Sequence, residues 1–191
     1  MSGYYDYTPL VQLDRPVVLT SYLTEFTRAV AHRAAALLGL PYHDIERLIE
    51  HEAGQDIAKL VFDGGEASYR RHESLCLQRV LRERPSGLIA LSDGGLLDDD
   101  NLDRIRHLGR LVLFDFDLPN LYWRTQRLSR RSDSTDWHPL FEGPPSSIDE
   151  IRPFFLERKG GFSSPDLCID SNSLEPPAAC EIVMRWMESE P

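Results

Sequence analysis

The stretch Pro16-Val17-Val18-Leu19-Thr20-Ser21-Tyr22-Leu23-Thr24-Glu25-Phe26-Thr27-Arg28-Ala29 decides the fold. Its apolar first half predicts a buried strand, and the apolar spacing that follows predicts a helix from about Phe26 to Leu38. A strand, a short turn and a helix in this order form the architecture of a phosphate-binding loop, where backbone N–H groups at a helix start surround phosphate oxygens.

The residues that bind phosphate in a working loop are replaced in this one. The working pattern is G-x-x-x-x-G-K-[ST], in which glycines let the backbone wrap the phosphates and the lysine reaches the outer ones. Thr20 and Glu25 stand at the glycine positions and Phe26 at the lysine position, so only Thr27 matches, as the magnesium ligand. We therefore predict weak nucleotide binding, with Phe26 filling the former nucleotide cleft.

The composition predicts one acidic globular domain. The chain has 191 residues, a formal net charge of −10 and a pI near 5.0, which disfavours a nucleic-acid partner. Of 21 basic residues only Lys59 and Lys159 are lysines, and neither precedes Ser or Thr, so no other segment supplies the loop lysine.

The cysteines and the apolar runs indicate a cytoplasmic protein. Cys76, Cys168 and Cys180 have spacings that match no zinc or redox motif, so we predict core thiols in a reducing compartment. No apolar run approaches the length of a membrane span, and the N-terminus lacks a signal pattern. We therefore expect no membrane partner.

Short apolar runs alternate with helical patterns along the rest of the chain. We predict strands at 42–43, 87–91, 111–114 and 167–170, and helices at 44–51, 55–84 with a break at Gly64-Gly65, 98–107, 119–131 and 177–187. This order predicts an α/β fold with a five-stranded parallel sheet, helices on both faces, and ligands at the carboxyl ends of the strands. Residues 1–15 are an expected extension, 16–188 a single domain, and 129–147 an expected lid or mobile loop.

Five motifs follow the loop: Asp44-Ile45-Glu46-Arg47-Leu48-Ile49-Glu50 with Gly54, Phe62 with Tyr69-Arg70-Arg71-His72-Glu73, Ser92-Asp93-Gly94-Gly95, Trp123-Arg124-Thr125-Gln126-Arg127, and Glu157-Arg158-Lys159-Gly160-Gly161-Phe162. In this order they resemble the D-x-D-x-x-I-E, F-R-x-x-E, triple-glycine, R-T-x-x and E-R-x-P-L-Y segments of the shikimate kinase family. The resemblance implies the fold of a P-loop kinase-like three-layer sandwich. It also implies shikimate as the small-molecule ligand, and ATP and magnesium as cofactors if any activity remains.

The resemblance also implies an acid-binding pocket. Arg70 and Arg158 match the arginines that clamp the substrate carboxylate, which a planar guanidinium does bidentately. Gly94 and Gly95 match glycines beneath the substrate ring, and Glu46, in place of an aspartate, matches the residue that holds the hydroxyls. The alternative for the two arginines is a purely structural role.

The nucleotide half of the implied site is less complete. Asp44 matches the aspartate at the magnesium site, which would be catalytic if the protein is active, although an aspartate there is also a good helix N-cap. Thr27 and Arg124 match nucleotide-contacting positions, with Thr27 as the other magnesium ligand or an ordinary first-turn residue. The lid arginine of the family appears as His138, which carries a charge only part of the time near neutral pH.

Three functions are compatible with this pattern. The first is a catalytically impaired, shikimate kinase-like binding or regulatory module for shikimate or a related hydroxy-carboxylate. The second is a divergent small-molecule kinase in which Arg130 or Arg131 compensates for the missing loop residues. The third is a scaffold that binds another protein, whose identity the sequence leaves open.

Overall fold

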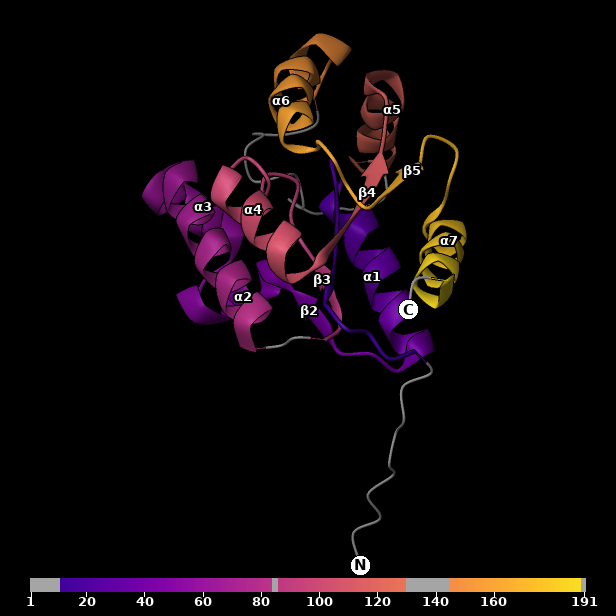
Figure 1. The fold of residues 1–191 in the computed structure, drawn as a ribbon. Coiled ribbons are helices and arrows are strands. Elements are labelled where there is room, and N and C mark those ends of the chain that lie inside the picture. Colours follow the sequence, from indigo (N-terminus) through magenta and orange to yellow (C-terminus); the bar gives the residue numbers. More distant parts are fainter. Residues whose placement is uncertain (1–10, 84–85, 130–144, 190–191) are drawn as a thin grey trace, which may run out of the picture.

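The computed structural model describes residues 11–83, 86–129 and 145–189 (Figure 1). At its centre lies a five-stranded sheet in which every pairing is parallel and the strand order is β2-β3-β1-β4-β5. The strands are β1 (Val17–Ser21), β2 (Tyr42–Asp44), β3 (Leu88–Ala90), β4 (Arg110–Asp115) and β5 (Leu167–Asp170). The predicted α/β class and five-stranded parallel sheet are confirmed.

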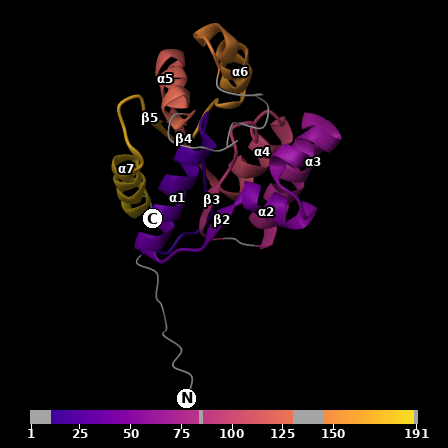
Figure 2. The same ribbon diagram turned by 180° about the vertical axis from the view of Figure 1, so that it is seen from behind.

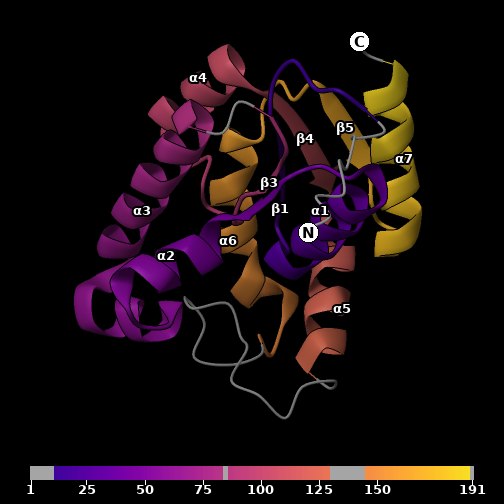
Figure 3. The same ribbon diagram turned by 90° about the horizontal axis from the view of Figure 1, so that it is seen from below.

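Helices cover both faces of the sheet. They are α1 (Thr24–Leu38), α2 (Ile45–Ala53), α3 (Ile57–Glu83), α4 (Asp99–Leu108), α5 (Leu118–Ser129), α6 (Ile148–Gly161) and α7 (Pro176–Ser189). Helices α1 and α7 pack together on one face, and α3 and α4 lie on the other (Figure 3). Seen from front and behind, α5 and α6 stand side by side beyond the carboxyl end of β4 (Figures 1 and 2).

The break predicted within the long third helix is present. Gly65 has φ 72° and ψ 171°, a left-handed φ that residues with a side chain rarely adopt, and it kinks α3. The part of α3 that follows this kink packs against α4 and carries the arginine motif.

Helix α6 is the element that the sequence patterns did not predict. It contains Pro153, which removes a backbone donor from the helix, and it ends at Gly160 and Gly161. Its buried side chains include Phe154, Phe155 and Arg158, so tertiary packing holds the helix despite these residues.

The prediction of three core thiols is correct at two positions. Cys76 and Cys180 are buried, whereas Cys168 is exposed. Cys168 lies on β5, which is an edge strand with only β4 beside it, so alternate side chains face away from the core. In the part of the chain that the structure describes, no helix is long and apolar enough to cross a membrane.

Candidate functional site

The candidate site lies at the carboxyl ends of the strands. Here Tyr22 and Leu23 join β1 to α1, and Asp44 ends β2. The Thr20 hydroxyl donates to the Ser92 carbonyl oxygen at 3.1 Å, which ties the end of β1 to the segment after β3. The site is therefore assembled from loops that the parallel sheet brings to one edge.

The turn after β1 is closed by its own hydrogen bonds. The Ser21 hydroxyl lies 2.9 Å from the Thr27 hydroxyl, and it accepts from the Leu23 backbone N–H at 3.0 Å. The Ser21 hydroxyl also lies 2.9 Å from the Leu23 carbonyl oxygen. Thr27 is fully buried, so the hydroxyl at the predicted magnesium position is engaged within the turn.

Phe26 points into the core from the first turn of α1. It is 6% exposed, and its ring meets Phe114 and Phe116 edge to face, with 5.3 Å between centroids in each pair. These distances are favourable for aromatic pairs. The residue at the lysine position is thus part of an aromatic cluster formed with the end of β4.

Arg124 covers this aromatic cluster. Its guanidinium lies 5.4 Å from the ring of Phe26 and 5.1 Å from that of Phe116, within the range of a cation–π contact. Nη2 donates to the carbonyl oxygens of Ser171, at 3.2 Å, and of Leu174, at 2.5 Å. Burial lowers the pKa of this group. The arginine predicted to contact nucleotide is therefore hydrogen-bonded to backbone carbonyl groups of this protein.

A second aromatic group covers the turn from the side of α6. Tyr22 stacks on Phe155 with 4.8 Å between centroids and meets Phe162 edge to face at 4.7 Å. Tyr22 is buried, and this burial raises its pKa. The turn is thus enclosed by aromatic side chains from both α1 and α6.

Asp44 caps α2, as one of its two predicted roles requires. Its Oδ1 accepts from the Arg47 backbone N–H at 3.2 Å, and its Oδ2 accepts from Arg28 Nε at 2.7 Å. Because a guanidinium already neutralises Asp44 and the Thr27 hydroxyl is engaged elsewhere, this pair does not fit a magnesium ion as the side chains lie.

Glu46 lies beside the same guanidinium. Arg28 Nη1 is 3.4 Å from Glu46 Oε2, and the Tyr69 hydroxyl donates to Oε1 at 3.2 Å. Burial raises the pKa of Glu46 to about 8 against the opposing effect of Arg28. Burial thus favours the protonated form of this carboxyl group, which can donate a hydrogen bond as well as accept one.

Arg70 is held by acidic neighbours on its own helix. Nη1 donates to Glu73 at 3.0 Å, and Nε and Nη2 each lie 3.2 Å from Glu66 Oε1. Its guanidinium also lies over Gly94, where an added Cβ would come within 2.2 Å of Cζ. Gly94 thus leaves space for Arg70, and the guanidinium occupies the face expected for a substrate ring.

Arg158 forms the most deeply buried ion pair of the site. It is 1% exposed, and its Nε donates to the fully buried carboxylate of Asp93. The guanidinium stacks on the Phe154 ring at 3.6 Å, and Nη1 donates to Glu157 at 2.9 Å. Asp93 stands where the resemblance places a glycine, so a carboxylate of this chain meets the arginine expected to bind the substrate carboxylate.

The remaining motif positions lie partly inside and partly outside the site. Gly95 packs tightly, since an added Cβ would be 2.6 Å from the Leu91 side chain. Phe62 is 89% exposed, which leaves it outside the site. His138, Arg130 and Arg131 lie outside the described residues.

The roles of Arg28, of Glu73 as a partner of Arg70 and of Asp93 as a partner of Arg158 were not predicted from the sequence. The sequence did contain a signal for Arg28. It is a basic residue directly after Thr27, in the first turns of α1, from which its side chain can reach Asp44 at the end of β2. Asp93 stood out as a departure from the glycine pattern, yet the motif alone does not give its partner, which is 65 residues away.

Comparisons with known proteins identify the family of the chain. The family model described as shikimate kinase matches residues 28–188. Shikimate kinases from Desulforudis audaxviator and Symbiobacterium thermophilum are 26% and 28% identical over 175 and 177 residues. These matches cover 91% and 90% of this chain and 87% and 96% of the relatives.

Solved structures show the same fold. Shikimate kinase from Bacteroides thetaiotaomicron gives a TM-score of 0.74 at 17% identity, covering 91% of this chain and 98% of that one. The enzyme from Acinetobacter baumannii, solved in complex with shikimate, gives 0.71 at 18% identity, covering 92% and 93%. With the family model matching most of its length, the chain belongs to the shikimate kinase family.

Proposed function

We propose that this protein is a member of the family that has lost ordinary ATP-dependent phosphoryl transfer and acts as a binding or regulatory module. One observation carries this proposal. Phe26, at the position of the phosphate-binding lysine, is buried against Phe114 and Phe116, and Arg124 covers the cluster. A phosphate group at this place would meet aromatic rings instead of an ammonium group.

The energetic cost of these replacements is large. Phosphoryl transfer depends almost entirely on positioning and charge neutralisation, and one lost stabilising group costs on the order of 3 kcal/mol, or about a hundredfold in rate. Glu25 adds a carboxylate at a glycine position, and a charge pair about 4 Å apart is unfavourable by roughly 4 kcal/mol at an effective dielectric near 20. Together these changes oppose both nucleotide binding and catalysis.

We expect shikimate phosphorylation by this protein to be about 10⁴-fold slower than the rate of about 1 per second typical of enzymes, because at least two charge-stabilising features are missing. The measurement is ³¹P NMR of a mixture of protein, Mg-ATP and shikimate, with a shikimate kinase that keeps the intact loop as control. A turnover of about 1 per second or faster would contradict the proposal.

The ligand class that we propose for the module is a hydroxylated ring carboxylate such as shikimate. The support is that Arg70 and Arg158 both contact the segment after β3, Arg70 at the Ser92 hydroxyl at 3.5 Å and Arg158 at Asp93, which competes for its guanidinium. Glu46 is hydrogen-bonded to Tyr69, the neighbour of Arg70. An incoming carboxylate must displace Asp93 from the guanidinium, so we expect the unmodified protein to bind shikimate weakly.

Removing the competing carboxylate is therefore expected to strengthen shikimate binding. Asp93→Gly frees a charged hydrogen-bond donor worth about 1.5–3 kcal/mol, so affinity rises roughly tenfold to a hundredfold. Calorimetric titration with shikimate gives the affinity, and shikimate methyl ester is the uncharged control. Asp93→Asn, which keeps the size of the side chain, is the second variant if Asp93→Gly is unfolded.

Arg70→Ala, placed in the Asp93→Gly protein, is expected to reduce the gained affinity by about 1.5–3 kcal/mol. Two outcomes contradict the acid-binding role. One is that neither Asp93 variant binds shikimate more tightly than the unmodified protein. The other is that the methyl ester binds as well as shikimate.

A divergent kinase is the second candidate, in which Asp44 would have to leave Arg28 before it could hold magnesium. The cluster of Arg28 with Asp44 and Glu46 places a cation and two carboxyl groups at the end of β2 beside the loop. The relatives carrying the name shikimate kinase support phosphoryl transfer as the ancestral activity. The ³¹P measurement distinguishes this candidate from the proposed module.

A further inference from the structure

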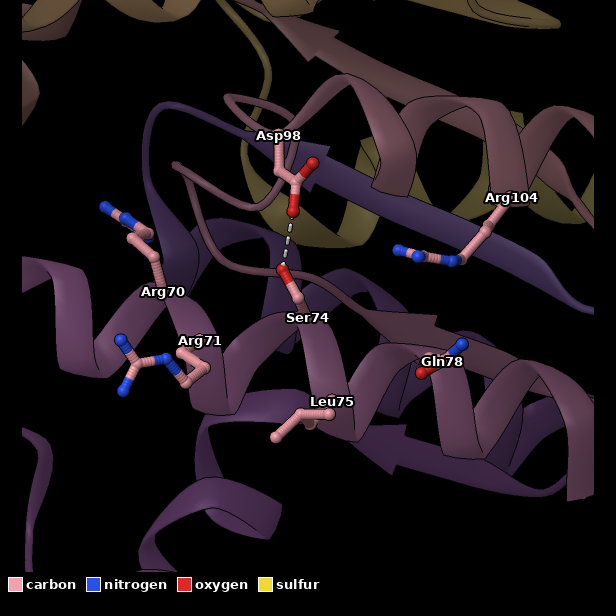
Figure 4. Close-up of a pocket in the computed structure, with 7 residues that line it drawn as sticks. All are labelled: Arg70, Arg71, Ser74, Leu75, Gln78, Asp98 and Arg104. Carbon is pink, nitrogen blue, oxygen red and sulfur yellow. Dashed lines mark hydrogen bonds between the residues drawn. The ribbon is translucent and has the colours of Figure 1, made fainter.

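A groove between α3 and α4 lies on the outer side of the site. It has a volume of about 350 Å³ and is lined by Arg70, Arg71, Ser74, Leu75, Gln78, Asp98 and Arg104 (Figure 4). A space of this size suits a small organic molecule more than a single inorganic ion. Apart from Arg70, none of these lining residues has an acid-binding or nucleotide-binding role.

The lining of the groove is basic, whereas the protein as a whole is acidic. Three of its seven lining residues are arginines and one is an aspartate, whereas the whole chain has a formal net charge of −10. The single carboxylate is already engaged, because Asp98 caps α4 by accepting from the Asp100 backbone N–H at 3.0 Å and accepts from the Ser74 hydroxyl at 3.0 Å. With three guanidinium groups against one carboxylate, the formal charge of the lining is positive.

The arginines differ in how firmly the chain holds them. Arg70 is fixed by Glu66 and Glu73, as described above. Arg104 reaches from α4 toward α3, and its ion pair with the exposed Asp100 is long, at 3.5 Å (Figure 4). Arg71 is exposed, and no ion pair or hydrogen bond joins it to another residue within the described ranges. Arg104 Nη1 also donates to Asn101 Oδ1 at 3.2 Å, so the N–H groups left to meet a ligand are those of Arg71 and the others of Arg104.

Hydrogen bonds join the two helices that form the groove, and its lining is partly apolar. Asn101 Nδ2 donates to the Ser74 hydroxyl at 2.9 Å and to the Gly95 carbonyl oxygen at 3.0 Å, which ties α3 to the start of α4. Leu75 follows Ser74 on α3 and is 58% exposed. A ligand that fits has acidic groups at its ends and an apolar body between them.

We propose that this groove binds a small organic anion whose carboxylate or phosphate groups are carried on an apolar body. Arg71 and Arg104 contact the acidic groups, and Ser74 and Gln78 supply polar contacts along the groove. This site shares Arg70 with the proposed acid-binding residues but includes neither Arg158 nor Glu46, and it does not rest on the proposed loss of kinase activity.

The test is a titration of ¹⁵N-labelled protein with isophthalate and with phenyl phosphate, followed by the backbone amide shifts of Ser74 and Gln78. These probes distinguish a dicarboxylate from a phosphate ester as the preferred ligand, and benzamide is the neutral control. We expect saturable shifts with at least one acidic probe at concentrations below about 10 mM and none with benzamide.

Substitutions separate this site from general attraction of anions. Arg71→Ala combined with Arg104→Ala should weaken binding about tenfold or more. Arg152→Ala combined with Arg185→Ala removes two exposed arginines elsewhere and should change affinity by less than about twofold. The proposal is overturned if neither acidic probe saturates, if both double variants lose affinity equally, or if the first retains it.

Discussion

Phe26→Ala is expected to lower the free energy of unfolding by about 3–5 kcal/mol, the usual cost of deleting a buried aromatic side chain. The side chain is 6% exposed and contacts two other phenylalanine rings and the guanidinium of Arg124. Urea unfolding followed by circular dichroism gives the change. In this protein the lysine position of the loop thus contributes to stability.

Phe62→Ala provides the matched control, because Phe62 is 89% exposed on α3. Its substitution should change the free energy of unfolding by less than about 0.5 kcal/mol. Equal effects of the two substitutions would mean that Phe26 does not occupy the core in solution. The proposal that its side chain closes the nucleotide cleft would then be wrong.

Arg158→Ala is expected to destabilise the protein by a similar amount, about 3–5 kcal/mol, because it leaves the carboxylate of Asp93 buried without its cation. The double variant Arg158→Ala with Asp93→Ala should be more stable than the Arg158→Ala protein, since it removes the unpaired charge. Urea unfolding of the unmodified protein, both single variants and the double variant gives the coupling energy.

Arg152→Ala is the control for this ion pair, because Arg152 pairs with Asp149 at 2.9 Å on the surface of α6. An exposed pair contributes at most about 1 kcal/mol. If Arg158→Ala cost no more than Arg152→Ala, Asp93 would not be a buried partner of Arg158, and the competition proposed for the substrate carboxylate would lose its basis.

The strands and their order along the chain were predictable because parallel strands buried on both faces are short apolar runs. The runs at 17–19, 87–91 and 111–114 are of this kind, and each contains or overlaps a strand of the structure. The kink in α3 was equally predictable, because the pair Gly64-Gly65 interrupts an amphipathic pattern. Local sequence was sufficient for these features.

Helix α6 and the side-chain pairing of the site were not predictable in the same way. Pro153 and two glycines weaken the helical pattern of α6, whose buried face is held by contacts with distant residues such as Tyr22. The partners Arg158 and Asp93 are 65 residues apart. Motifs placed these residues near one pocket, but whether an arginine faces a ligand or a carboxylate of the same chain depends on tertiary packing.

Restoring the residues of a working phosphate-binding loop is expected to increase nucleotide binding. Glycine at Thr20 and Glu25 together with Phe26→Lys should improve Mg-ATP binding, since it supplies the backbone freedom and the cation that the pattern requires. Circular dichroism checks that this variant is folded, because Thr20 and Phe26 are both buried in the unmodified protein.

Calorimetric titration of the unmodified protein with Mg-ATP tests most directly whether its own aromatic side chains close the nucleotide cleft. If these side chains close the cleft, we expect no saturable binding of Mg-ATP, or a Kd weaker than about 1 mM. A Kd of about 10 μM or tighter, with one nucleotide bound per chain, would contradict it, because Phe26 and Glu25 would then have to leave room for the phosphates that they are proposed to exclude.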